Sequence, residues 1–482
     1  MHTGVLGTKG VTPNVALLVS LYTFELSVAS LMLAIPRLGD KTNLVSLLPS
    51  PLGLLCLTAS LLCAASSTVI AQQYAKSRGD GSRQFGLTVM LNLVPVVILL
   101  ATGELVIRIF SVQTPHGPVF MNVSLLPKNW HDVVARNHQI LKRAALEGSY
   151  LVYDDLMGWT VGPNRRSADG LNFSSVEGIR SPRPGMAFAD LPAGHRIALV
   201  GDSYTFGLDV PYEESWGYQL ERDLGPDFQI LNFGVSGYGL DQAYLRYDRD
   251  VRPWQPNIVI FGVFPHDVYR AMTVYTFTSF PYWEYVFAKP RFLVSDEHLS
   301  LVNVPPLPPA AILAKGSIRE LPFIEHDSGY RQTDWEWRYY HHLYLLRFLI
   351  SRYPRWEVAS TDLSDKAMKS ISAELLHAFV RRATAHGSMP IVVYLPARRD
   401  FHQPSRDIEE GVKLVHDVLR GAGIEYFDLT PCLLTVSASE RFVVTGGHYS
   451  AQANAAIAKC LRPVVLSHLA GMKSPKAARH AE

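Results

Sequence analysis

The sequence predicts an α/β protein whose main domain has three layers, with helices on both faces of a parallel sheet, preceded by a bundle of about three membrane helices. Three observations lead to this prediction. Three apolar runs lie within the first 110 residues, short apolar strands alternate with helical patterns further on, and polar loops follow those strands. Charged residues make up only 18% of the 482 residues, below the roughly 25% of an ordinary soluble domain, which favours a membrane portion.

Composition excludes several classes of protein. Hydrophobic residues make up 48% of the chain, too many for extended disorder. The formal net charge is +2 and no block of like charges occurs, so nucleic-acid binding is not expected. Four cysteines without a C-x-x-C pair argue against a disulfide-built scaffold and a zinc site. We therefore expect neither a metal nor an organic cofactor.

The three apolar runs are the first elements along the chain, and they are interpreted as membrane helices. They cover residues 15–35, 52–71 and 85–103, and each has about the 20 residues needed to cross roughly 30 Å of hydrocarbon. A cleaved signal peptide would explain the first run but not three in succession. We expect a transmembrane region over residues 1–110, the alternative being a single anchor followed by two buried helices.

Charges in the short loops predict the orientation of these helices. The N-terminal tail carries Lys9 and no acid, and the loop between the second and third runs carries Lys76, Arg78 and Arg83 against one acid. Positive charge keeps short loops in the cytoplasm. Three crossings then place the chain beyond about residue 110 outside the cytoplasm. The expected protein is a multi-pass protein of the cell membrane, with the lipid bilayer as a partner and an extracytoplasmic C-terminal domain.

The rest of the chain divides by pattern into a linker and lead-in (111–190, with a helix over 129–147), a main domain (191–470) and a C-terminal tail (471–482). Short apolar strands are expected at 197–200, 228–233, 257–262, 390–395 and 425–429. Helical patterns between them cover 213–224, 241–251, 366–386, 406–421 and 452–469. Such alternation predicts a parallel sheet whose ligand site lies at the carboxyl ends of its strands.

An insertion over residues 265–365 interrupts this alternation and is dense in aromatic residues. We interpret these residues as the core of a lid-like subdomain. Two functional alternatives are a wall for a sugar or lipid substrate and a belt at the membrane interface, where Trp and Tyr are favoured.

The first strand of the main domain ends in the most informative stretch, Gly201-Asp202-Ser203. A serine directly after a buried strand and before a helix projects its hydroxyl into the crevice at the sheet edge, and its N–H can help to bind an oxyanion. Gly201 permits the tight turn, and Asp202 can accept backbone hydrogen bonds. By itself the tripeptide is also compatible with an ordinary capped helix start.

Three later loops supply further polar groups at the same edge. The loop after the second strand contains Gly237 and exposed N–H groups suited to an oxyanion, and its glycines do not fit the dinucleotide pattern G-x-G-x-x-G. The third strand leads to His266 and Asp267, and His448 lies just before the last helix. One serine, one histidine and several donors at one sheet edge are what nucleophilic acyl transfer requires.

Through these residues, the segment 195–470 resembles an SGNH (GDSL-type) hydrolase domain attached to a membrane-embedded N-terminus, as in several bacterial envelope proteins. Ser203 matches the nucleophile of the family's first block, Gly237 the oxyanion-hole glycine of the second, and His448 the histidine of the fifth. The resemblance implies a three-layer α/β/α fold and an enzyme that acts on ester bonds.

Two positions depart from the family pattern. His266 replaces the asparagine that donates to the oxyanion, and an imidazole N–H could donate in its place. Thr445 replaces the acid that stands three residues before the histidine. His448 could then be held by a backbone carbonyl in a dyad, by another acid such as Asp267 or Asp428, or in a site that is weak or inactive.

Two of the cysteines are expected on the outer side of the membrane. Cys432 follows the last strand, and Cys460 lies in the last helix. A disulfide between them would brace the loop that carries His448. The sequence leaves this pairing open, because it does not give the distance between the two residues.

The expected function is that of a membrane-anchored serine esterase, deacylase or O-acyltransferase that acts on acylated cell-envelope glycans or lipids. Ser203 attacks the ester, His448 takes its proton, and the N–H groups of Ser203 and Gly237, with His266, hold the oxyanion. The alternative is a catalytically weak or inactive glycan-binding component of an envelope polysaccharide assembly or export system.

Overall fold

The computed structural model describes residues 97–98, 100–114, 117–192, 194–279, 286–295, 298–352, 363–401, 415–445 and 447–472. The predicted membrane helices 15–35 and 52–71 lie outside these ranges, as does most of 85–103. Within the described ranges, no helix combines the length and the apolar character needed to cross a bilayer. The chain divides into two compact units, residues 1–133 with 332–357 and residues 134–331 with 358–482.

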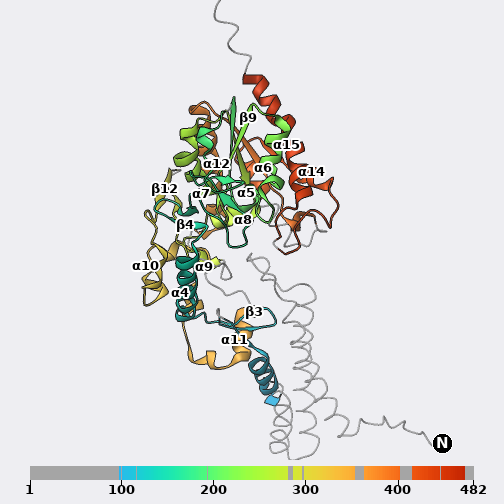
Figure 1. The fold of residues 1–482 in the computed structure, drawn as a ribbon. Coiled ribbons are helices and arrows are strands. Elements are labelled where there is room, and N and C mark those ends of the chain that lie inside the picture. Colours follow the sequence, from blue (N-terminus) through green and yellow to red (C-terminus); the bar gives the residue numbers. More distant parts are fainter. Residues whose placement is uncertain are drawn as a thin grey trace, which may run out of the picture. The chain divides into compact units, whose positions relative to one another are not determined.

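The first unit contains a helix over residues 100–110, a small antiparallel sheet and a helix from the later segment. These elements are β1 (Val112–Thr114), β2 (Gly117–Phe120), β3 (Val123–Ser124) and α11 (Tyr344–Arg352). Helix α11 lies against the strand region (Figure 1), where the Arg347 guanidinium donates to the carbonyls of Leu125 and Leu126 at 3.1 and 2.7 Å. The Phe348 ring packs edge-on against Phe120 at 5.3 Å.

The second unit is built on a five-stranded parallel sheet, with strand order β14-β13-β10-β8-β9. Its strands are β8 (His195–Val200), β9 (Phe228–Asn232), β10 (Ile258–Val263), β13 (Met389–Tyr394) and β14 (Tyr426–Asp428). All five predicted strands are therefore confirmed. Every residue of the central strand β10 is buried, which explains its continuous apolar run.

Helices cover both faces of this sheet (Figure 1). One face carries α7 (Leu240–Arg246) and α12 (Asp365–Ala385), and the other carries α6 (Trp216–Leu224), α14 (Thr430–Leu434) and α15 (Ala451–Met472). Alternate side chains of β10 enter the two cores: Val259 and Phe261 join the α7–α12 side, and Ile258 and Ile260 the α6–α15 side. The predicted three-layer α/β/α arrangement is confirmed.

The predicted helices agree with this arrangement where they are described. Ser364 caps helix α12: its hydroxyl accepts the N–H of Ala367 at 3.2 Å, as expected for a helix N-cap. Of the predicted helix 406–421, residues 415–421 are described and are helical. The expected helix 129–147 is α4 (Trp130–Glu147).

The lead-in is part of the second unit's core rather than a loose connection. It forms two hairpins, β4 (Leu151–Asp154) with β5 (Gly158–Val161), and β6 (Phe173–Ser174) with β7 (Arg180–Ser181). Trp159 of β5 is 1% exposed, and its ring nitrogen donates to the Ser236 carbonyl in the loop after β9 at 3.0 Å. The lead-in thus supports a loop at the carboxyl edge of the sheet.

The insertion is divided between the two units. In the second unit it contains α8 (Pro265–Arg270), α9 (Thr276–Ser279), the hairpin β11 (Arg291–Ser295) and β12 (His298–Val302), and α10 (Pro309–Leu313). The Phe287 ring stacks on Trp159 at 5.4 Å, so this part shares the main core. Residues 332–357 belong to the first unit, where Trp337 and Tyr339 are exposed. The expectation of a lid with a core of its own therefore needs correction for the part around Phe287.

Candidate active site

Ser203 lies where β8 passes into the short helix α5 (Ser203–Phe206). Gly201 has a φ of +152°, and a Cβ at this position would collide with the Thr205 side chain, so the turn requires glycine. Asp202 is the N-cap of α5, and its carboxylate accepts the Tyr204 N–H at 2.8 Å. The serine is 4% exposed. These local features fix its hydroxyl at the carboxyl edge of the sheet.

The histidine from the far end of the sequence reaches this serine. The Nε2 atom of His448 lies 2.9 Å from the Ser203 Oγ, a hydrogen-bond distance. The loop that holds the imidazole is tied to α5, because the Tyr204 hydroxyl donates to the Gly447 carbonyl at 3.1 Å and the Tyr204 ring lies 4.7 Å from the imidazole. The sequence placed these two residues at one edge, and the structure brings them into contact.

An acid that the sequence analysis did not select completes the constellation. The Oδ2 atom of Asp209 lies 2.7 Å from His448 Nδ1 and also accepts the His448 backbone N–H at 3.3 Å. These hydrogen bonds from His448 hold the pKa of the Asp209 carboxyl below its usual range, so the group is ionised near pH 7. A carboxylate at Nδ1 leaves Nε2 free to accept the serine proton.

The two acids considered from the sequence have other partners, which corrects that expectation. Asp267 lies inside α8, accepts the Phe264 N–H at 2.9 Å and pairs with Arg270 at 3.0 Å. Asp428 accepts the N–H of Thr430 at 2.8 Å, at the start of α14. Each carboxylate accepts a backbone N–H at the start of a helix, and neither is a hydrogen-bond partner of His448.

The position of Asp209 depends on its backbone conformation and on contacts with a distant part of the chain. Its φ is +71°, in the left-handed region that few residues other than glycine adopt. The loop is fixed by the buried Arg180 of β7, whose guanidinium donates to the carbonyls of Phe206, Gly207 and Val210. One sequence signal could have identified Asp209. Gly207, four positions after Ser203, is a residue type that ends helices, and an acid two positions beyond such a short helix stays near the serine.

Backbone donors for an oxyanion are present at the expected positions. Among the described residues, the N–H groups of Ser203 and Gly237 donate to no protein acceptor. Gly237 has a φ of +81° in the turn after β9. Unsatisfied N–H groups beside a nucleophile are available to a developing negative charge.

His266, the third expected donor, is the second residue of α8 and follows β10 at the same sheet edge. Its ring makes an edge-on contact with Phe264 at 5.2 Å and has no hydrogen-bond partner among the described residues. Crowding by surrounding protein, followed by the charges of Arg270 and Arg399, lowers the pKa of His266. Although part of the residue reaches solvent, the imidazole is thus neutral near pH 7 and retains one N–H donor.

Arg270 joins the three loops that carry these groups. One guanidinium nitrogen lies 2.9 Å from Asp202, 3.0 Å from Asp267 and 3.2 Å from the Tyr238 carbonyl. Burial, followed by the negative charge of Asp202, raises the pKa of Asp267 well above its usual range. The cluster therefore favours the protonated form of Asp267, and Arg270 fixes the serine turn relative to the Gly237 loop.

Cys432 and Cys460 form a disulfide bond, with their Cα atoms 6.2 Å apart. The bond joins α14 to α15 and closes a segment that contains His448. The pairing that the sequence left open is thus present. No group of three or more His, Cys, Asp or Glu side chains in the described ranges is arranged to hold a metal ion.

Comparison with known proteins gives similarity at the level of solved structures only. No protein-family model matches the chain, and no curated protein matches it. Similar structures include a lipase/acylhydrolase from Enterococcus faecalis (13% identity, 56% of this chain and 96% of that chain, TM-score 0.29). The chain is also similar to an acetyl xylan esterase, with 13% identity over 56% of this chain and 99% of that chain and a TM-score of 0.31. A third similar structure is a psychrotrophic esterase from Pseudoalteromonas sp., with 10% identity over 58% of this chain and 98% of that chain and a TM-score of 0.28. What Ser203, His448 and Asp209 can do chemically therefore follows from their own geometry.

Proposed function

We propose that the chain is a membrane-anchored serine esterase or O-acyltransferase in which Ser203, His448 and Asp209 act as a catalytic triad. The observation that carries the proposal is the continuous hydrogen-bonded line from Asp209 through His448 to Ser203, with distances of 2.7 and 2.9 Å. A buried serine, an imidazole and an ionised carboxylate in this order are the components of nucleophilic acyl transfer.

The proposed reaction has two halves. In the first, the Ser203 oxygen bonds to the ester carbonyl carbon while His448 Nε2 takes the hydroxyl proton. The N–H groups of Ser203 and Gly237, with the His266 ring, bind the oxyanion. The bond to the alcohol oxygen then breaks, His448 returns the proton to that oxygen, and the acyl group remains on Ser203.

In the second half, His448 removes a proton from water or from a sugar hydroxyl as that oxygen attacks the acyl carbon. The bond to Ser203 breaks and the serine recovers its proton from His448. Water gives hydrolysis, whereas a sugar hydroxyl gives acyl transfer. Asp209 stabilises the imidazolium that forms in each half and remains ionised throughout.

Two observations support an envelope substrate, one from the sequence and one from the structure. The three apolar runs and the basic loop between the second and third runs favour an extracytoplasmic position for the domain, where acylated glycans and lipids of the cell envelope are the available esters. The disulfide between Cys432 and Cys460 is compatible with an oxidising compartment.

A glycan-binding component without catalysis is the alternative function. Its sequence support was the absence of an acid at Thr445 and the replacement of asparagine by His266. The contact between Asp209 and His448 supplies an acid from another part of the chain and favours the enzyme.

The test is covalent labelling and turnover of the purified full-length protein. We expect a fluorophosphonate probe to label the wild type and p-nitrophenyl acetate to be hydrolysed, and both signals to disappear in Ser203→Ala. Ser439→Ala, at an exposed serine, serves as the matched control and should behave as the wild type. Equal labelling and turnover in wild type and Ser203→Ala would favour the glycan-binding alternative.

A further inference from the structure

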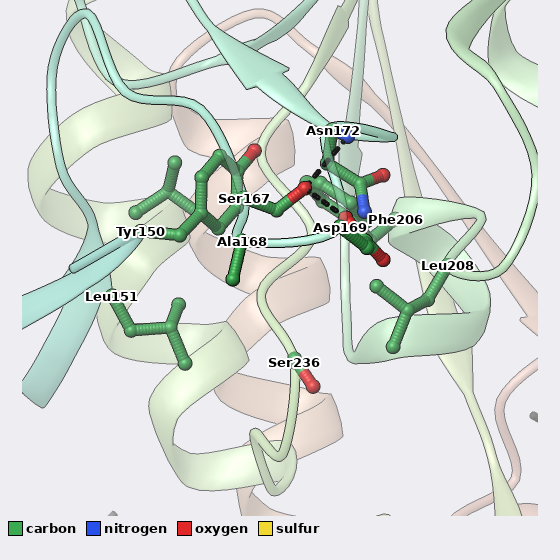
Figure 2. Close-up of a pocket in the computed structure, with 10 residues that line it drawn as sticks. Tyr150, Leu151, Ser167, Ala168, Asp169, Asn172, Phe206, Leu208 and Ser236 are labelled. Atoms are coloured by element: carbon green, nitrogen blue, oxygen red, sulfur yellow. Dashed lines mark hydrogen bonds between the residues drawn. The ribbon is translucent and has the colours of Figure 1, made fainter. Parts of the chain in front are cut away.

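A cavity of about 370 Å³ lies in the second unit, between the lead-in and two loops at the edge of the sheet (Figure 2). The lead-in contributes Tyr150, Ser167 and Asn172 to its walls. The loops contribute Phe206, Leu208 and Ser236.

The cavity adjoins the segments that carry the proposed catalytic groups. Leu208 directly precedes Asp209, Ser236 directly precedes Gly237, and Phe206 ends the helix that begins at Ser203. Neither Ser203 nor His448 is part of the lining. A molecule in the cavity would therefore contact the segments next to the proposed catalytic groups and not Ser203 or His448 themselves.

An unpaired buried amide points to a ligand in the cavity. Asn172 is 2% exposed, yet neither side-chain atom hydrogen-bonds to a described residue, and its Oδ1 atom is buried. The Ser236 hydroxyl also lacks a partner within the described part of the chain. Buried polar groups are almost always paired in folded proteins. Because the Oδ1 atom has no surface open to the cavity, only the Nδ2 group of this amide can meet a ligand there, as a donor to a ligand that accepts hydrogen bonds.

The other walls restrict the chemistry of that ligand. The Tyr150 and Phe206 rings and the Leu208 side chain offer apolar surface, while Asp169 offers a carboxylate held by Ser167 and the Leu171 N–H. A fatty acyl chain would cover the Asn172 amide without pairing it. Among the residues that the structure describes, no Lys, Arg or His lines the cavity, and the acid Asp169 does, which disfavours an anionic ligand. Arg180, buried 4.5 Å from the Phe206 ring, disfavours a cation.

We propose that this cavity binds a sugar unit of the substrate, next to the unit that carries the ester. A pyranose combines C–H faces, which pack on aromatic and aliphatic side chains, with hydroxyl groups that can accept from the Asn172 Nδ2 group and pair with the Ser236 hydroxyl. The volume is within the lower range of small-molecule sites. The link to Ser203 rests on the proposed function, whereas sugar binding itself is measurable without catalysis.

The binding test uses the full-length Ser203→Ala protein and the methyl glycosides of glucose, mannose and N-acetylglucosamine in calorimetric titrations. We expect saturable binding of at least one glycoside. Adding Ala168→Trp, which fills the cavity from an exposed alanine of its rim, or Asn172→Leu should weaken that binding tenfold or more. Ala189→Trp, at an exposed alanine outside the cavity, is the matched control and should bind as the parent does. Absence of binding to all three glycosides, or binding that Ala168→Trp leaves intact, would overturn the proposal.

The kinetic test compares mono-O-acetylated methyl glycosides with p-nitrophenyl acetate, which carries the same acyl group. We expect Ala168→Trp to raise the KM for the glycosides tenfold or more relative to the KM for p-nitrophenyl acetate. An equal loss with both substrates, or a loss confined to p-nitrophenyl esters of longer acids, would contradict a sugar site. If no ester is cleaved while Ala168→Trp still abolishes glycoside binding, the proposed function fails and the sugar site stands.

Discussion

The carboxylate of Asp209 holds His448 at two points, the Nδ1 atom of the ring at 2.7 Å and the backbone N–H at 3.3 Å. The two residues are 239 positions apart in the sequence. Because one oxygen accepts both hydrogen bonds, the carboxylate fixes the direction of the imidazole and the tautomer in which Nε2 faces Ser203.

Replacing Asp209 by asparagine should therefore impair turnover more than binding. An amide that donates to Nδ1 would favour the tautomer with a proton on Nε2, which cannot accept the serine proton, and the expected fall in kcat is about 10²- to 10⁴-fold. Steady-state kinetics with p-nitrophenyl acetate measure the change. Asp190→Asn, at an exposed acid, is the control and should keep wild-type kcat. Wild-type kcat in Asp209→Asn would remove Asp209 from the mechanism.

The buried ion pair between Arg270 and Asp202 predicts strong coupling between these residues. Arg270→Met should lower the free energy of unfolding by about 3–5 kcal/mol, since it leaves a buried carboxylate without its partner. Asp202→Asn keeps an oxygen for the Tyr204 N–H, so the double variant should be destabilised by clearly less than the sum of the single variants. Urea unfolding of the four proteins tests this. Strict additivity would show that the two groups do not interact.

Arg270 is also expected to act as a positioning residue. It joins the serine turn to the Tyr238 carbonyl beside Gly237, so its loss should displace the oxyanion donors from the serine. We expect Arg270→Met to lower kcat for p-nitrophenyl acetate with little change in KM, at a temperature where the variant is fully folded. A rise in KM with kcat unchanged would assign Arg270 to substrate binding instead.

Asp267 provides a prediction with a defined sign in pH. Burial, followed by the charge of Asp202, raises the pKa of this carboxyl in the folded protein above its ordinary value of 3.8. Between these two pKa values the folded state holds a proton that the unfolded state has lost. Its contribution to stability therefore falls as pH rises from about 4 through the raised pKa of the folded state. Asp267→Asn lacks this dependence, and its Tm relative to the wild type should increase over the same range. A Tm difference that is constant with pH would contradict a raised pKa for Asp267.

Much of the fold was predictable because it depends on local pattern. The five strands are short apolar runs buried on both faces, and this alone marks them in the sequence. Parallel strands align their carboxyl ends, which brought Ser203 and His448 to one edge without knowledge of their distance.

The acid of the site was not predictable in the same way. Asp209 reaches His448 through a residue in the left-handed region, in a loop held by Arg180 from the lead-in. Neither this backbone conformation nor the contact between Arg180 and Val210, 30 positions apart, produces a periodic pattern in the sequence. Asp267 and Asp428 were reasonable candidates by their place after strands, but helix-start hydrogen bonds occupy both.

The disulfide between Cys432 and Cys460 leads to the last prediction. It closes a segment of 28 residues that includes His448, and the chain-entropy estimate for such a loop is about 3.5 kcal/mol. We expect Cys432→Ala/Cys460→Ala to lose about this free energy of unfolding in urea. Reductant should reproduce the loss in the wild type and have no further effect on the double variant.

The same change should reach the active site, because the bond joins the helices on either side of the loop that positions the imidazole. A more mobile loop forms the 2.9 Å contact between His448 and Ser203 less often. The kcat for p-nitrophenyl acetate should therefore fall in the double variant, and to the same extent in the reduced wild type. Loss of stability with unchanged kcat would mean that the contacts of Asp209 and Tyr204 position the imidazole without help from the disulfide.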